Sequence, residues 1–163
     1  PVANALKVGY SLIKASTKVG AGTVTNTRKY VRHPSDIPIN VSSIGTEHPG
    51  QMQDLSLGGI CCEVKHNIEI GTKIVINIPI VKPAYRGFGV VVWCRPEGDH
   101  YDIGIQFQEE AEAFKSRMIE QVCQIEHYKL QVQETEGRKL DGESAALEWI
   151  HKHAAEFAAQ IGE

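Results

Sequence analysis

The chain has no long apolar run, although 42% of its 163 residues are hydrophobic. No stretch approaches the roughly 20 apolar residues that a helix needs to cross a bilayer. The first residues also lack the apolar stretch and small-residue cleavage site of a secretory signal peptide. Four cysteines occur, but none belongs to a Cys-x-x-Cys pair, so a disulfide scaffold is not indicated. The sequence therefore predicts a cytoplasmic chain with free thiols and no transmembrane segment.

The residue sets that would support an enzyme are missing as well. There is no Ser/His/Asp or Cys/His set with suitable spacing, no Walker loop and no convincing pair of carboxylates. Neighbouring residues on a strand point to opposite faces, so Cys61 and Cys62 would not bind one metal ion together. We therefore expect a non-enzymatic binding protein with no catalytic residue, no metal and no cofactor.

Acidic residues are absent from residues 1–35, which contain six basic residues. Residues 109–163 have the opposite balance, with twelve acidic and six basic residues. A cationic N-terminal segment on an acidic body favours an anionic ligand or surface, with a solvated tail as the alternative. Residues 17–27 are rich in glycine and threonine, so we predict a flexible N-terminal arm over residues 1–27.

Apolar and polar residues alternate through residues 36–107. Alternation with a period of two places one apolar face on each strand. Turns that contain proline, glycine and asparagine separate the runs, and no helical pattern intervenes. The pattern predicts a mainly β, antiparallel barrel or sandwich. Its expected core positions are Ile37, Ile39 and Val41; Ile60, Cys62 and Val64; Ile74, Ile76, Ile78 and Ile80; Phe88, Val90 and Val92; and Tyr101, Ile103, Ile105 and Phe107.

The apolar spacing changes to that of a helix after Phe107. A first helix is expected over about 109–134, with Gly137 as its end. Asp141 can cap a second helix that runs to about Ile161. The expected apolar stripes are Phe114, Met118, Val122, Ile125 and Val132 on the first helix, and Leu147, Ile150, Ala154, Phe157 and Ile161 on the second. These helices, in residues 108–163, would pack on the β domain or form an oligomer interface.

Two short motifs contain residues suited to ligand binding. The first is an Arg-x-x-x-Arg formed by Arg28 and Arg32, and the second is the Asp-x-Ser-x-x-Gly that begins at Asp54. Each motif alone is weak, because Asp-x-Ser often marks only a turn. Here they occur in order, with one predicted strand between them and a strand that begins at glycine after the second.

This combination resembles the PilZ family, whose signature is these two motifs on a six-stranded β-barrel. The stretch Gly87 to Arg95 and the strand from Tyr101 to Phe107 look like the closing strands of that domain. The resemblance covers residues 28–107 and implies a six-stranded antiparallel barrel. It also implies binding of cyclic di-GMP, with one or two molecules per chain, and transfer of the signal to a protein partner.

The chemistry of the side chains is consistent with such a ligand. An arginine fork matches the O6 and N7 acceptors of guanine and also pairs with phosphate. A carboxylate at Asp54 can accept from guanine N1–H and its amino group, and Ser56 can donate to a phosphate or base oxygen. Gly58 and Gly59 would allow positive φ and close approach of the ligand. Arg95 is a further candidate for phosphate, and its neighbour Trp93 is a lesser candidate for a stacking face, since alternation favours a core position for it. The predicted ligand-binding residues are Arg28, Arg32, Asp54, Ser56, Gly58, Gly59 and Arg95.

The sequence thus predicts a bacterial cyclic di-GMP receptor that orders its arginine arm on binding and signals through protein contacts. The alternative is an adaptor of the same fold that binds no ligand. A polymer of RNA or DNA is disfavoured, because the body is acidic and no exposed aromatic platform is evident. The geometry of the arginine pair is left open, since either an extended or a helical segment could hold a dianion.

Overall fold

The computed structural model describes residues 30–108 and 112–161, with side chains for all of these except 112, 113 and 154–161. The predicted arm over residues 1–27 and Arg28 lie outside the described residues. The strands are β1 (His33–Pro34), β2 (Pro38–Ser43), β3 (Thr46–Leu55), β4 (Gly59–Val64), β5 (Lys73–Ile78), β6 (Tyr85–Glu97) and β7 (His100–Gln108), and the helices are α2 (Glu112–Glu136) and α3 (Gly142–Ile161).

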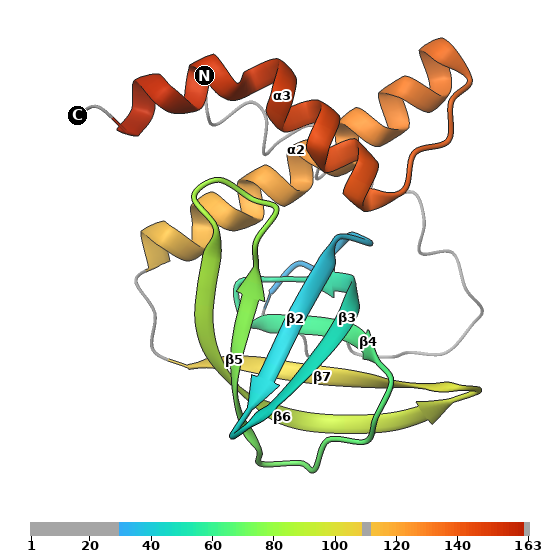
Figure 1. Ribbon diagram of the computed structural model, residues 1–163, viewed down its shortest axis with the longest axis vertical. Coiled ribbons are helices and arrows are strands. Elements are labelled where there is room, and N and C mark those ends of the chain that lie inside the picture. Colours follow the sequence, from blue (N-terminus) through green and yellow to red (C-terminus); the bar gives the residue numbers. More distant parts are fainter. Residues whose placement is uncertain (1–29, 109–111, 162–163) are drawn as a thin grey trace.

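Six of the strands form a closed antiparallel barrel (Figure 1). The order is β3-β2-β5-β6-β7-β4, and pairing between β3 and β4 closes the sheet. The two-residue strand β1 adds to β3, with Pro34 opposite Asp54. The predicted six-stranded barrel followed by helices is confirmed.

The buried face of most strands follows the predicted alternation. The isoleucines and valines predicted on β2, β4 and β5 are almost inaccessible to solvent. On β6 the predicted face is wrong, because Phe88 is 56% exposed and Val92 is 43% exposed. The face of β6 that is buried consists of Tyr85, Gly87, Gly89 and Val91. Gly89 belongs there because a Cβ would lie 2.5 Å from Ile105 Cγ2, and a glycine gives no apolar signal in the sequence.

Two β-bulges interrupt the alternation. In β3, Met52 pairs with Cys62 and Asp54 with Cys61, so Gln53 is an extra residue. In β6, Val91 pairs with Ile105 and Trp93 with Gly104, so Val92 is an extra residue. A bulge reverses the face on which the following side chains lie. The consequence is that Asp54 and Trp93 leave the barrel interior, where strict alternation with Met52 and Val91 would place them.

The two helices lie at one end of the barrel, with α2 on the barrel and α3 across α2 (Figure 1). Side chains of α2 join the barrel core through Met118, Ile119, Val122, Ile125 and Val132. Gln121 adds a polar contact, accepting from the backbone N–H of Lys82 at 3.0 Å and donating to the Lys82 carbonyl. The described part of the chain contains no helix long and apolar enough to span a membrane.

The predicted stripe of α3 is wrong at Leu147, whereas Ile150 packs against the core as predicted. The side chains of Ala154, Phe157 and Ile161 lie outside the described residues. Leu147 is 58% exposed, while Ala145, Ala146 and Trp149 are buried. Alanines allow two helices to approach closely, which the apolar spacing alone did not indicate. The helix ends follow the prediction: Gly137 has a φ of 68° at the end of α2, and Asp141 Oδ1 accepts from the Ser144 N–H at 2.7 Å.

Candidate ligand-binding site

The bulges bring four residues into one row across the outer surface of the barrel. Asp54 of β3 is opposite Cys61 of β4, Cys61 is opposite Gly104 of β7, and Gly104 is opposite Trp93 of β6. Adjacent strands are about 4.8 Å apart, so the row is about 14 Å long. A carboxylate therefore lies at one end and an indole at the other, with only a thiol and a glycine between them.

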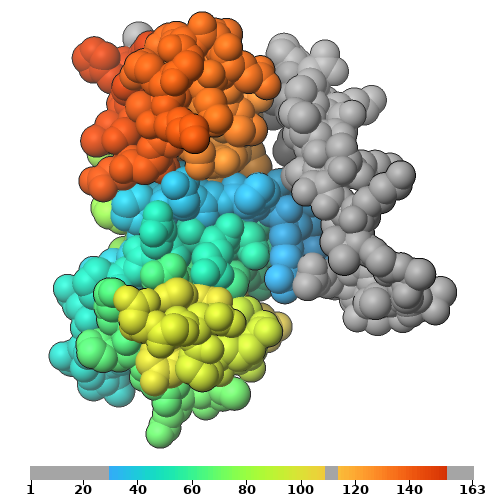
Figure 2. Space-filling view, turned by 90° about the vertical axis from the view of Figure 1, so that its right-hand side faces the viewer, coloured from blue at the N-terminus to red at the C-terminus, as the bar shows by residue number. Residues whose placement is uncertain are grey.

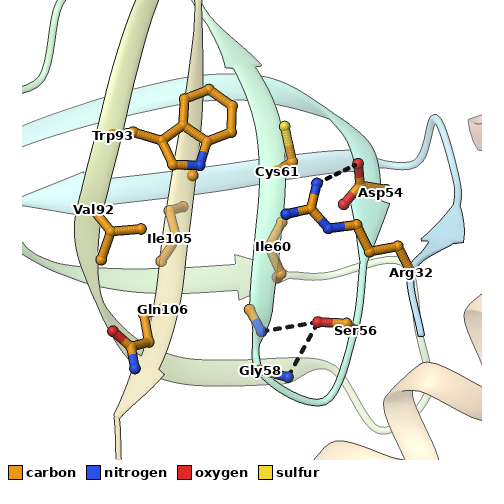
Figure 3. A pocket seen from close by; sticks show the side chains of 12 residues that line it. Arg32, Asp54, Ser56, Gly58, Ile60, Cys61, Val92, Trp93, Ile105 and Gln106 are labelled. Carbon is orange, nitrogen blue, oxygen red and sulfur yellow. Dashed lines mark hydrogen bonds and ion pairs between the residues drawn. The ribbon is translucent and has the colours of Figure 1, made fainter. Parts of the chain in front are cut away.

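A pocket of about 290 Å³ lies over this row (Figure 3). Five of the seven predicted ligand-binding residues line it, namely Arg32, Asp54, Ser56, Gly58 and Gly59. Arg95 does not line the pocket, and Arg28 lies outside the described residues. Residues that the motif analysis did not select also contribute to the walls. Among them are Cys61, Val92, Trp93, Gly104, Ile105 and Gln106. They lie on β4, β6 and β7, and the bulge at Val92 that turns Trp93 toward the pocket has no marker in the sequence.

Arg32 is held at the pocket by the short strand that follows it. His33 and Pro34 pair with Leu55 and Asp54, which fixes the chain immediately after Arg32 along β3. In Figure 3 the guanidinium points toward the Asp54 carboxylate, and Arg32 Nη1 lies 3.9 Å from Asp54 Oδ2. The two side chains are 42% and 29% exposed. An ion pair this long and this exposed is weak. Each of the two groups can therefore leave the other and bind a ligand instead.

Ser56 organises the turn that leads from β3 to β4. Its Oγ accepts from the N–H groups of Gly58 at 3.1 Å and Gly59 at 3.3 Å, and its own N–H donates to the Gly59 carbonyl. The hydroxyl hydrogen remains able to donate. Leu57 is 42% exposed because it lies at the tip of this turn.

The two glycines of the turn lack the predicted positive φ, since neither Gly58 nor Gly59 has one. A Cβ on Gly58 would lie 2.7 Å from the Tyr30 ring, and one on Gly59 would lie 2.0 Å from the Ile105 carbonyl oxygen. Glycine is therefore required at these positions because the Tyr30 ring and strand β7 approach the turn closely.

Trp93 is a wall of the pocket, so its predicted place in the core is wrong. Its indole lies over Gly104, where a Cβ would come within 2.0 Å of the indole nitrogen. The guanidinium of Arg95 lies 4.5 Å from the centre of the Trp93 ring, a distance typical of a cation–π contact. Within the described residues Arg95 forms no ion pair, and this cation stands beside the pocket wall.

The charges around the pocket affect the thiol between them. Burial raises the pKa of Cys61 to about 11, and the carboxylates of Asp54 and Asp102 add to that rise, while Arg32 and Arg95 oppose it. The thiol is therefore neutral at physiological pH and is a weak nucleophile. Its S–H donates to Gln53 Oε1 at 3.2 Å, so it forms part of the pocket floor. The described residues contain no cluster of three or more His, Cys, Asp or Glu suited to a metal ion.

Comparison with known proteins agrees with this architecture. The inhibitor of motility MotI/DgrA of Bacillus subtilis matches with a TM-score of 0.51 and 15% identity, over 63% of this chain and 52% of that one. This chain thus spans about half the length of the Bacillus protein. The PilZ domain of Escherichia coli YcgR, solved with c-di-GMP, matches with a TM-score of 0.53 and 12% identity, over 69% of this chain and 98% of that one.

At these identities the two structures establish a shared fold. No curated protein sequence matches the chain significantly. The family model of the PilZ domain matches residues 26–124, a range that includes both motifs, the whole barrel and the first half of α2. Because that match covers more than half of the 163 residues, the chain belongs to the PilZ domain family.

Proposed function

We propose that this protein is a non-enzymatic receptor that binds cyclic di-GMP in the pocket between Arg32 and Trp93. The observation that supports the proposal best is the meeting of Arg32, Asp54 and Ser56 in one pocket on a PilZ barrel. These residues come from two motifs about twenty positions apart. The first motif supplies a cation, Arg32, and the second supplies an anion, Asp54. A ligand with both guanine and phosphate uses the cation and the carboxylate together.

The two charged groups have complementary roles toward the ligand. Arg32 forks to guanine O6 and N7 or to a phosphate, since both acceptor pairs fit a guanidinium. Asp54 accepts from guanine N1–H and the exocyclic amino group. A base that lacks those donors would leave a desolvated carboxylate unpaired, which disfavours it. The weak Arg32–Asp54 ion pair costs little to separate, so the ligand can insert between them.

Trp93 and Arg95 extend the binding surface at the other end of the row. An indole face stacks on a nucleobase, and a guanidinium beside it contacts a phosphate. The row of about 14 Å is long enough for a dinucleotide, since it spans three inter-strand spacings. In this proposal Ser56 donates its hydroxyl hydrogen to the ligand while Gly58 and Gly59 keep the turn compact.

The remaining part of the proposal concerns the N-terminal arm. Arg28 would close over the ligand from the opposite side to the barrel, so that binding orders the segment before Tyr30. Ordering lowers the affinity and converts occupancy into a change of shape that a protein partner can detect. One molecule uses the row described here, and a second would stack on the first beneath Arg28. An adaptor without ligand is the competing function.

Isothermal titration calorimetry with cyclic di-GMP, GMP and a short RNA tests the proposal. We expect saturable binding of cyclic di-GMP alone. Arg32→Ala and Asp54→Ala should each weaken binding by about 1.5–3 kcal/mol, the range for hydrogen bonds to charged groups. That loss corresponds to a rise in Kd of roughly tenfold or more, because 1.4 kcal/mol is a factor of ten.

Arg86→Ala is the matched control. Arg86 is an exposed arginine of β6 that does not line the pocket. Its removal changes the net charge by the same amount as Arg32→Ala and should leave Kd unchanged. Equal affinity in wild type, Arg32→Ala and Asp54→Ala would refute the site. No binding of cyclic di-GMP to the wild type would favour the adaptor instead.

A further inference from the structure

Asp36 joins the segment that follows Arg32 to both helices. Its Oδ1 accepts from Lys129 Nζ of α2 at 3.0 Å, and its Oδ2 accepts from the Gly142 N–H at the start of α3 at 3.1 Å. The side chain is 35% exposed, and that of Lys129 is 21% exposed. A single carboxylate four residues after Arg32 thus contacts both of the described helices.

The start of α3 lies directly against the backbone of residue 36. A Cβ on Gly142 would come within 2.7 Å of the Asp36 carbonyl carbon and 2.8 Å of its oxygen. An N–H at a helix start has no partner within the helix and attracts negative charge. Burial would lower the pKa of Lys129, but the hydrogen bond to Asp36 and the neighbouring carboxylates raise it above its ordinary value. The Asp36 carboxylate is therefore bound by one defined donor on each helix.

The segment from Pro34 to Asp36 lies next to both the ligand pocket and a second cavity. Pro34 is paired with Asp54, which lines the ligand pocket. Pro34, Asp36, Glu126 and Lys129 help to line the second cavity, of about 420 Å³. In Figure 2 the first described residues, in blue, lie directly beneath the helices, in orange. The segment is thus placed where the ligand pocket and α2 come together.

The segment is also fixed to β3 at defined points. The Ser35 N–H donates to the Gln53 carbonyl at 3.1 Å, and the Gln51 side chain donates to the Asp36 carbonyl at 3.1 Å. Gln53 is the bulge residue next to Asp54, so a change at Asp54 reaches Ser35 through one residue and Asp36 through two. The path from pocket to helix consists of direct contacts throughout.

We propose that Asp36 transmits occupancy of the ligand pocket to the start of α3, an inference that rests on the proposed function. A ligand that holds Arg32 also holds β1 and Ser35 against β3. Asp36 is then kept in place beneath Gly142 and Lys129, and the first turn of α3 opens less often. Asp36 is thus a positioning residue that does not touch the ligand.

Hydrogen exchange of the full chain, with and without saturating cyclic di-GMP, tests this inference. In the wild type the amides of residues 142–146 should exchange about fivefold more slowly with ligand, the lower end of typical coupling between sites. In Asp36→Ala the ligand-dependent slowing should disappear. Calorimetry on the same samples should still show saturable binding by this variant.

Asp141→Ala is the matched control, since the Asp141 side chain also accepts a hydrogen bond at the start of α3, from the Ser144 N–H, and among the described residues it forms no hydrogen bond or ion pair with residues 33–36. It should speed exchange in both states and leave the ligand-dependent slowing intact. If Asp36→Ala does not fold, Asp36→Asn decides, because it keeps an acceptor for Gly142 and removes the charge beside Lys129; its slowing should be clearly smaller than in the wild type.

Three results can be distinguished. Slowing of wild-type size in the Asp36 variants would overturn the role of Asp36. Saturable binding to the wild type without any change in α3 would overturn the coupling and leave the proposed function standing. Absence of binding to the wild type would overturn the proposed function and this inference with it.

Discussion

Gly104 decides where the Trp93 indole lies. The indole occupies the space that a Cβ at position 104 would need, so the ring rests on the backbone of β7. At the same site Ser56 and Gly59 form the turn against which β7 lies. The pocket therefore depends as much on the residues without side chains as on those that would contact a ligand.

Removal of the indole should weaken binding of cyclic di-GMP. Stacking of a base on an aromatic ring contributes about 1–3 kcal/mol by alanine substitution, and Trp93→Ala should lose that amount in calorimetry. Gly104→Ala should act in the same direction, because its methyl group displaces the ring. In a Trp149→Phe background, ligand should change the fluorescence of Trp93. Wild-type affinity in Gly104→Ala together with an unchanged fluorescence response would argue against the stacking role.

At the scale of the strands, what could be predicted ends at the bulges. Alternation correctly identified the inward faces of β2, β4 and β5, because burial of isoleucine and valine on one face defines the register. Asp54 and Ser56, which the motifs selected, line one pocket, and their role in ligand binding stays a prediction. The position of Trp93 could not be predicted, since an extra residue at Val92 depends on how β6 pairs with β7. The contact face of α3 likewise depends on the close approach that alanines permit.

The two helices are connected by a charged cluster that makes their contact depend on pH. Arg138 donates to both carboxylate oxygens of Glu148, at 2.9 and 3.2 Å. The Tyr128 hydroxyl donates to the same carboxylate at 2.8 Å. Arg138 first, and Tyr128 second, lower the pKa of Glu148 from its ordinary 4.5 to about 2. A lowered carboxyl pKa contributes stability above the ordinary value, and the contribution disappears as the pH falls through the folded value.

Thermal unfolding across pH 7 to 2 measures this contribution. The wild type should lose stability between pH 4.5 and about 2 more steeply than Glu148→Gln, whose side chain does not titrate. At pH 7 the variant should melt at a lower temperature than the wild type. Glu134→Gln is the control, because Glu134 is exposed and has no ion pair with any described residue. Parallel pH profiles for wild type and Glu148→Gln would contradict the prediction.

At the scale of the whole molecule, the barrel and the helices share one core. The buried cluster continues from the strands through Met118 and Val122 of α2 to Trp149 of α3. Tyr85 of β6 stacks on Phe114 of α2, with ring centres 5.4 Å apart and an interplanar angle of 22°. Parts that share a continuous core unfold together, because neither can expose its side of the contact alone.

The two tryptophans allow this cooperativity to be measured, because Trp93 lies in the barrel and Trp149 in α3. Trp149→Phe leaves a reporter of the barrel, and Trp93→Phe leaves a reporter of the helices. In urea, each variant's fluorescence transition should have the same midpoint as its own transition by far-ultraviolet circular dichroism. A helix reporter that changes at lower urea than the circular dichroism would show that α3 unfolds first.

The two bulges have a consequence for how such a protein can be altered. Each one turns a chosen side chain outward while the residues around it continue to fill the interior. Neither the Asp54 carboxylate nor the Trp93 indole belongs to the buried core, so their exchange leaves that core in place. Under the proposed function, selectivity for a nucleobase and thermal stability could therefore be adjusted independently, which would make this barrel a suitable scaffold for sensors of further cyclic dinucleotides.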